Sequence, residues 1–146
     1  MTTMTNGSNN NIRWMAPELS MIETGREQTL TYKTDIYAYG IALIECITGK
    51  LPYPEIKRVC YQHSFSLASQ ADVMKDFAVV QHVANGGRPK RPTGAPSDQW
   101  MSDGLWDLLR ESWAAKPDER PTMLAFSTRL RQVEAAAYRQ QQQPSA

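Results

Sequence analysis

The stretch Arg13-Trp14-Met15-Ala16-Pro17-Glu18 stands near the start of the sequence and is its most informative part. Taken alone, it predicts a packed turn with Trp14 and Met15 in a hydrophobic core, because large apolar side chains are usually buried. Four further distinctive stretches follow along the chain: Asp35-Ile36-Tyr37-Ala38-Tyr39-Gly40, Gly49-Lys50-Leu51-Pro52-Tyr53-Pro54, Gly87-Arg88-Pro89, and Trp113 with Pro117, Arg120 and Pro121.

In their order and spacing, these stretches resemble the C-terminal lobe of a eukaryotic protein kinase catalytic domain. The resemblance covers about residues 11–134 and is closest to the tyrosine-kinase-like group and to tyrosine kinases. In that family the first stretch lies well past the middle of the domain. The resemblance therefore implies a mainly α fold, a partial C-terminal (helical) lobe from which the N-terminal lobe and the catalytic loop are absent.

Apolar residues at helical spacing independently predict four helices. The first begins near Thr34, whose hydroxyl can cap the free N–H groups of the first turn, and stops at Gly49. The others cover about 76–84, start at Ser102 or Asp103, and start at Thr122. No segment alternates in the way that a half-buried strand would.

The first of these helices is apolar on all sides, so we expect it to lie in the middle of the fold with neighbours around it. In the family, one side of this helix is covered by a helix and a catalytic loop that this sequence does not contain. This face, with some of Ile36, Tyr39, Leu43 and Ile47, should therefore be exposed or poorly packed. An exposed apolar patch marks a partner site or self-association.

The sequence divides into three predicted regions. Residues 1–11 form a disordered tail, 12–134 a partial kinase domain, and 135–146 a loose Gln-rich tail. Residues 59–75 are interpreted as an insertion, because the sequence before them would continue naturally into the sequence after residue 75. Two explanations stay open for this insertion: a retained intron read in frame, or a variable surface loop.

The resemblance also assigns roles to single residues. It pairs Glu18 with Arg120, and a planar guanidinium can hold a carboxylate through two hydrogen bonds. It makes Arg13-Trp14-Met15-Ala16 a substrate-positioning loop, beside the plainer interpretation as packing alone. Asp35 should act as a helix cap or lie exposed, since the loop that it holds in the family is lacking. Three more residues have structural roles in the family: Gly40, Trp113 and Pro117.

The parts that phosphoryl transfer needs are missing from these 146 residues. Neither His63 nor His82 is followed by Arg-Asp, and the pair Asp76-Phe77 is followed by alanine. No catalytic, cofactor-binding or metal-binding residue is therefore predicted. ATP and magnesium are implied only for full-length members of the family. A zinc site is not predicted, because Cys60 and His63 lack a second ligand pair.

Three interpretations of function follow. The chain is a fragment of an active protein kinase and is inactive by itself, or a non-catalytic kinase-derived module that binds proteins, or a product without a function. The expected partners are a protein substrate, an intact kinase, or a second copy through the exposed apolar face.

Composition argues against other classes of partner. The net charge is +1, so no broad electrostatic field favours nucleic acid or a membrane surface. The longest apolar stretch, Ile36–Ile47, is too short for a bilayer span of about 20 residues. Two cysteines, Cys46 and Cys60, fit a reducing compartment, and we expect a cytoplasmic protein.

Overall fold

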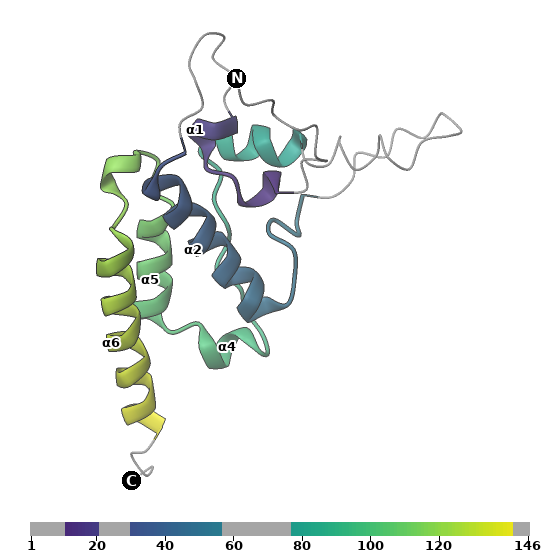
Figure 1. Cartoon of the computed structure of the whole chain (residues 1–146). Coiled ribbons are helices and arrows are strands. Elements are labelled where there is room, and N and C mark those ends of the chain that lie inside the picture. Colours follow the sequence, from purple (N-terminus) through teal and green to yellow (C-terminus); the bar gives the residue numbers. More distant parts are fainter. Residues whose placement is uncertain (1–10, 21–29, 57–76, 142–146) are drawn as a thin grey trace.

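The computed structural model describes residues 11–20, 30–56 and 77–141, and all regular structure within these ranges is helical (Figure 1). The helices are α1 (Pro17–Ser20), α2 (Tyr32–Thr48), a segment at 77–84, α4 (Ser97–Trp100), α5 (Asp103–Ser112) and α6 (Met123–Gln141). Two 3₁₀ turns cover Ile12–Trp14 and Pro117–Glu119. The mainly α class is thus confirmed. The predicted insertion at 59–75 lies outside the described residues.

The central helix α2 begins three residues earlier than the sequence predicted. Thr31, not Thr34, is its N-cap, and the Thr31 hydroxyl accepts hydrogen bonds from the N–H groups of Lys33 and Thr34. The Thr34 hydroxyl in turn accepts one from the N–H of Thr31. Two hydroxyls three residues apart thus form a reciprocal capping box. In it Thr31 is the N-cap, and Thr34 is the third residue of the helix. The helix ends as predicted at Gly49, which has a left-handed φ of 62°.

Two stripes on α2 explain why part of the expected open face is buried. Ile36 is fully buried, together with Gly40 and Ile44, which follow it at intervals of four residues. Tyr39 is 37% exposed and begins a second stripe, continued by the half-buried Leu43 and Ile47. Residues four apart share one face of a helix, so of the four residues named for the open face, Ile36 lies on the buried stripe and the other three on the more open one.

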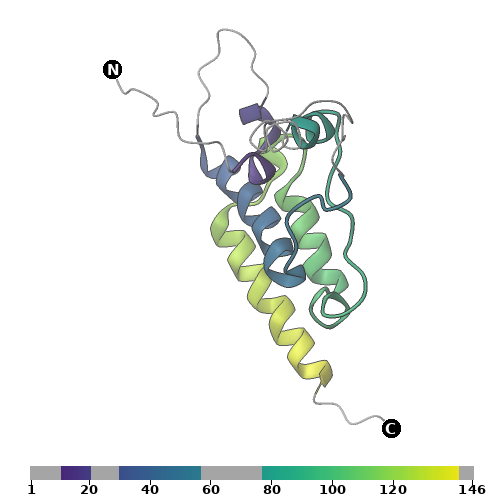
Figure 2. The same ribbon diagram turned by 90° about the vertical axis from the view of Figure 1, so that its right-hand side faces the viewer.

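Helix α5 packs against both α2 and α6, and the three helices complete the core (Figures 1 and 2). α5 starts at the predicted cap Ser102, and α6 starts directly after Thr122, whose hydroxyl accepts from the N–H of Ala125. Phe126 of α6 is fully buried and packs edge-on against Tyr39 of α2, with ring centroids 5.5 Å apart.

α6 is longer than the sequence predicted. It continues to Gln141, past residue 134 where the Gln-rich tail was expected to begin, and its end extends beyond the other helices (Figure 2). This extension is explained by Ala135-Ala136-Ala137 and the Arg and Gln residues that follow, because these residue types are good helix formers. No helix in the described ranges combines the length and the apolar character that crossing a bilayer would require.

Candidate functional site

The segment from Ile12 to Leu19 lies against α2 and is fastened to it by two neighbouring side chains. The guanidinium of Arg13 donates to the carbonyl oxygen of Pro52, in the loop after α2, over 2.8 Å. The indole N–H of Trp14 donates to Oε2 of Glu45, on the last turns of α2, over 2.9 Å. The loop is thus held to the helical base by polar contacts in addition to packing.

Packing inside this loop is uneven. Ala16 is fully buried in the main core, whereas Arg13, Trp14 and Met15 are half-buried. The packed-turn interpretation therefore describes Ala16 fully and Trp14 and Met15 in part. Of the four residues that the resemblance assigned to positioning a substrate, three therefore remain partly open and Ala16 does not.

The structure brings together Glu18 and Arg120, which are 102 residues apart in the sequence. Nη1 of Arg120 donates to Oε1 of Glu18 over 2.6 Å, and Nη2 donates to Oε2 over 2.8 Å. The side chain of Arg120 is completely buried, whereas that of Glu18 keeps 30% of its surface exposed. This two-point contact joins α1, directly after the loop, to the segment that leads into α6.

Arg120 also binds the backbone of two other segments. Its Nε donates to the carbonyl of Ala114 over 3.0 Å, and Nη1 donates to the carbonyl of Lys33, at the start of α2, over 2.9 Å. The ammonium of Lys33 donates back to the carbonyl oxygen of Arg120 and to that of Asp118. A buried guanidinium is tolerated only when its donors are satisfied, and here they tie α1, α2 and α5 together.

Tyr37 lies beneath two guanidinium groups of this region, that of the buried Arg120 and that of the half-buried Arg88. Its ring centroid is 5.1 Å from Cζ of Arg120 and 5.8 Å from Cζ of Arg88, so both guanidiniums lie within cation–π distance. Arg88 itself donates to the carbonyls of Trp113, Val83 and Gly87. Burial raises the pKa of the Tyr37 hydroxyl, which lies 3.4 Å from that of Tyr53.

Opposing effects act on the Glu18 carboxyl, and the net result is a lowered pKa. Burial raises the pKa of this group, but the hydrogen bonds from Arg120 and from the backbone, with the positive charges of Arg120 and Arg88, lower it by more. Glu18 is therefore ionised more readily in the folded chain than in the unfolded chain.

This difference predicts an acid-dependent loss of stability. A carboxyl whose folded-state pKa is depressed contributes stability above its unfolded pKa, and that contribution is lost as the pH falls through the folded pKa. Urea titrations at a series of pH values from neutral to strongly acidic measure the free energy of unfolding. We expect this free energy to fall more steeply on acidification for the wild-type chain than for Glu18→Gln. Parallel curves for the two proteins would contradict the assignment.

The remaining residues named by the resemblance occupy structural positions. Asp35 is exposed in the first turn of α2 and is not the cap. Gly40 lies where α2 meets α5, and Trp113, 3% exposed, closes α5 and stacks edge-on against Trp106 at 5.7 Å. Pro117 begins the 3₁₀ turn that leads to Arg120.

The hydrogen bond between the Trp14 indole and Glu45 leads to a second prediction. Glu45→Leu removes the carboxylate that accepts the hydrogen bond of the indole N–H, and a lost hydrogen bond of this kind costs about 1 kcal/mol. We expect the indole ¹⁵N–¹H resonance of Trp14 to move toward its position in an unfolded peptide in Glu45→Leu. Glu45→Gln keeps an acceptor oxygen and should leave the resonance close to that of the wild type. Equal resonances in Glu45→Leu and the wild type would contradict the contact.

Within the described residues, no three His, Cys, Asp or Glu side chains gather closely enough to hold a metal ion.

Comparison with known proteins gives the family. The model for "Protein tyrosine and serine/threonine kinase" matches residues 1–130 of the 146-residue chain. The chain therefore belongs to the protein kinase family, and its helical fold is a partial C-terminal lobe of that domain.

The similar individual proteins include tyrosine kinases and a probable serine/threonine kinase. The chain is 32% identical over 120 residues to the human proto-oncogene tyrosine-protein kinase ROS. The aligned part is 82% of the chain and 4% of that protein. It is 33% identical over 126 residues to the probable serine/threonine-protein kinase roco6 of Dictyostelium discoideum, covering 84% of the chain and 5% of that protein. The transforming protein ros of UR2 avian sarcoma virus is 29% identical over 123 residues, 84% of the chain and 23% of that protein. The chain thus spans a small part of each relative.

Sequence reasoning did not single out the residues that surround the Glu18–Arg120 pair. Tyr37, Arg88 and Lys33 complete this arrangement, and Glu45 holds Trp14. Tyr37 and Arg88 lie inside stretches that the resemblance had marked, so their position in those stretches was a usable signal. Lys33 and Glu45 read as ordinary charged residues of a helix, and nothing in the sequence indicated their long-range partners.

Proposed function

We propose that this chain is part of a protein kinase that transfers the γ-phosphate of ATP to Ser, Thr or Tyr hydroxyls of proteins, with Arg13 to Ala16 positioning the protein substrate. The observation that supports this proposal best is the anchoring of the loop, through Trp14 to Glu45, Arg13 to Pro52, and Glu18 to Arg120. A loop fixed at both ends keeps its partly open side chains in one place, and orientation of the acceptor is a large part of catalysis in this reaction.

The isolated chain is proposed to be inactive. Its 146 residues contain no Gly-rich phosphate loop, no His-Arg-Asp and no Asp-Phe-Gly, and these are the parts that bind ATP, bind magnesium and orient the hydroxyl. ATP and magnesium are therefore proposed to bind elsewhere in a longer protein. Purified chain, incubated with radiolabelled ATP, magnesium and poly(Glu,Tyr) or myelin basic protein, should transfer no label above a chain-free control. Transfer above that control would contradict inactivity.

A graft tests the role of the loop. In the intact kinase domain of human ROS, the matching segment would be replaced by residues 11–134 of this chain. If the graft is active, Trp14→Ala and Arg13→Ala should raise KM for a peptide substrate and leave KM for ATP unchanged. An equal effect on both constants, or none on either, would reject a substrate-positioning role for the loop.

A second candidate function, non-catalytic protein binding, is favoured by an apolar groove between α2, α4 and α6. Its main lining residues are Leu43, Ile47, Trp100, Leu130, Val133 and Tyr138. Trp100 and Tyr138 are 59% and 64% exposed, so the same patch on two copies can pack against itself, as a twofold dimer requires. We propose a second copy as the partner. Sedimentation velocity should show association that increases with concentration and is weakened by Trp100→Glu, and a monomer at every concentration would reject it.

A further inference from the structure

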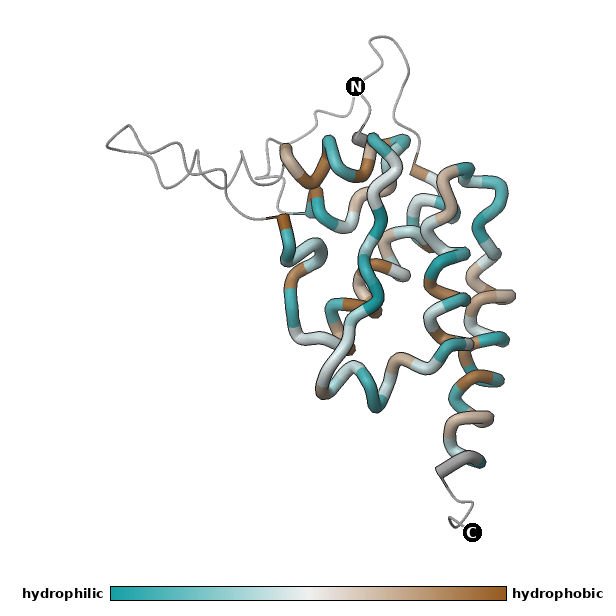
Figure 3. The backbone as a smooth tube through the Cα atoms, turned by 180° about the vertical axis from the view of Figure 1, so that it is seen from behind, coloured by the Kyte–Doolittle hydropathy of each residue, from teal (hydrophilic) through white to brown (hydrophobic). Residues whose placement is uncertain are grey.

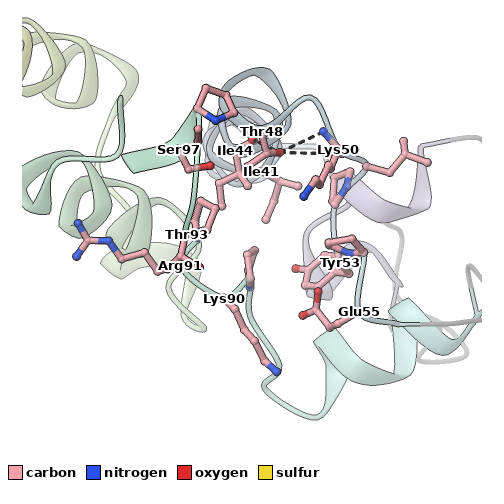
Figure 4. A pocket seen from close by; sticks show the side chains of 17 residues that line it. Ile41, Ile44, Thr48, Lys50, Tyr53, Glu55, Lys90, Arg91, Thr93 and Ser97 are labelled. Atoms are coloured by element: carbon pink, nitrogen blue, oxygen red, sulfur yellow. Dashed lines mark hydrogen bonds between the residues drawn. The ribbon is translucent and has the colours of Figure 1, made fainter. Parts of the chain in front are cut away.

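A cleft of about 250 Å³ lies beside α2 and shares only Pro96 with the lining of the groove described above (Figure 4). Residues 50–55, directly after α2, form one wall, and residues 89–97 form the other. Ile41 and Ile44 of α2 contribute apolar surface between the two walls. Five of the lining residues are prolines: Pro52, Pro54, Pro89, Pro92 and Pro96. We call this site the proline cleft.

The walls of the proline cleft are stiff. Each proline ring fixes the φ angle of its residue, so the walls lose little conformational freedom when a ligand binds. Tyr53, in the first wall, is 1% exposed and has a left-handed φ of 58°, a conformation that is kept by its burial in the core. A ligand would therefore meet a preformed site.

The second wall has unused backbone hydrogen-bonding groups. Residues 87–93 have no regular secondary structure and run as a drawn-out, largely hydrophilic segment from the 77–84 helix toward α4 (Figure 3). In this part of the described chain, the backbone N–H groups of Lys90, Arg91 and Thr93 make no hydrogen bond. Such an edge can pair with the backbone of an extended peptide.

The charges around the cleft favour an acidic ligand. Lys50 and Lys90 are exposed on opposite walls, and neither ammonium group forms a hydrogen bond or ion pair with another described residue. Arg91 is already paired with Asp103 at 2.7 Å. Glu55 is the one acidic residue in the lining, so the unpaired cations outnumber it. Complementary charge steers association and selects partners.

We propose that the proline cleft binds an extended segment of a partner protein, in which an apolar side chain enters the cleft and acidic side chains flank it. The apolar side chain contacts Ile41, Ile44 and the prolines, the acidic groups pair with Lys50 and Lys90, and the peptide backbone pairs with residues 90–93. This binding does not depend on phosphoryl transfer by a longer protein.

Fluorescence anisotropy with the 146-residue chain tests the proposal. The probe is a fluorescein-labelled peptide Asp-Glu-Leu-Glu-Val-Asp, and its control is the same peptide with Lys at every acidic position. We expect saturable binding of the acidic peptide only, weakened about tenfold or more by Lys50→Glu with Lys90→Glu. Glu55→Gln should tighten binding, because it removes the opposing charge.

Matched controls separate this site from general charge effects. Lys116→Glu makes one substitution of the same kind at a lysine outside the cleft, and it should leave the affinity unchanged. Circular dichroism spectra identify any variant that fails to fold, and N-methylation of alternate peptide nitrogens then tests backbone pairing on the unaltered chain. Binding that is lost on N-methylation supports the proposal. Absence of saturable binding to the wild-type chain, or equal binding by the Lys50→Glu/Lys90→Glu variant, would overturn it.

Discussion

Glu18→Ala will lower the free energy of unfolding by about 3–5 kcal/mol, because it leaves the guanidinium of Arg120 buried without its carboxylate. The other bonds of Arg120 go to neutral carbonyl groups and cannot balance its charge. A small helical domain is stable by only about 5–15 kcal/mol, so this variant should be largely unfolded at modest urea concentrations. The midpoint of urea unfolding, followed by tryptophan fluorescence, measures the effect.

A second arginine–carboxylate pair in the same chain supplies the control. Arg129 contacts Glu111 through both of its terminal nitrogens, but these side chains are 43% and 45% exposed. Exposed pairs contribute little, and we expect Glu111→Ala to cost less than about 1 kcal/mol. The comparison isolates burial, since both pairs have the same chemistry and the same two-point geometry. Equal losses in the two variants would show that the Glu18–Arg120 pair does not hold α1 in place.

Gly40→Ala should also lower the free energy of unfolding. A β-carbon at this position would lie 1.9 Å from Oγ of Ser112 and 3.0 Å from its Cβ. The Ser112 hydroxyl is buried and donates to the carbonyl of Leu109 over 2.6 Å, so it cannot move without losing that bond. Overpacking of this kind costs about 1–3 kcal/mol, which exceeds the gain of about 1 kcal/mol from replacing glycine inside a helix.

A double-mutant cycle identifies the cause of this loss. Ser112→Ala removes the oxygen at 1.9 Å and leaves the contact at 3.0 Å, so Gly40→Ala with Ser112→Ala should recover part of the stability. The readout is again the urea midpoint of the four proteins in the cycle. Strictly additive effects would mean that Gly40 is needed for some reason other than its approach to α5.

The sequence predicted the central features of this fold because each has a local signal or lies in a marked stretch. Gly49 ends α2, Ser102 caps α5 and Thr122 precedes α6, as capping rules predict. The pairing of Glu18 with Arg120 required the family resemblance, since no local rule joins residues 102 positions apart. The short helices α1 and α4 were not predicted from the sequence.

The sequence failed to predict the start and the end of helices where two sequence signals favour different boundaries. Thr31 and Thr34 are both suitable caps, and only their reciprocal bonds decide which one is outermost. The end of α6 was missed because a Gln-rich composition is typical of loose tails, while its alanines and arginines favour a helix. The proline cleft has no periodic pattern, because it is formed by two loops that approach each other only in the folded chain.

The long reach of the Glu18–Arg120 pair also sets an order of events during synthesis. Arg120 is added to the growing chain 102 residues after Glu18. At translation rates of about 5–20 residues per second, Arg120 is synthesised roughly 5–20 s after Glu18. Until then, α1 and the loop before it lack their main tether, whereas α2 already has its cap. On the ribosome, the central helix can therefore form well before the loop beside it is fixed.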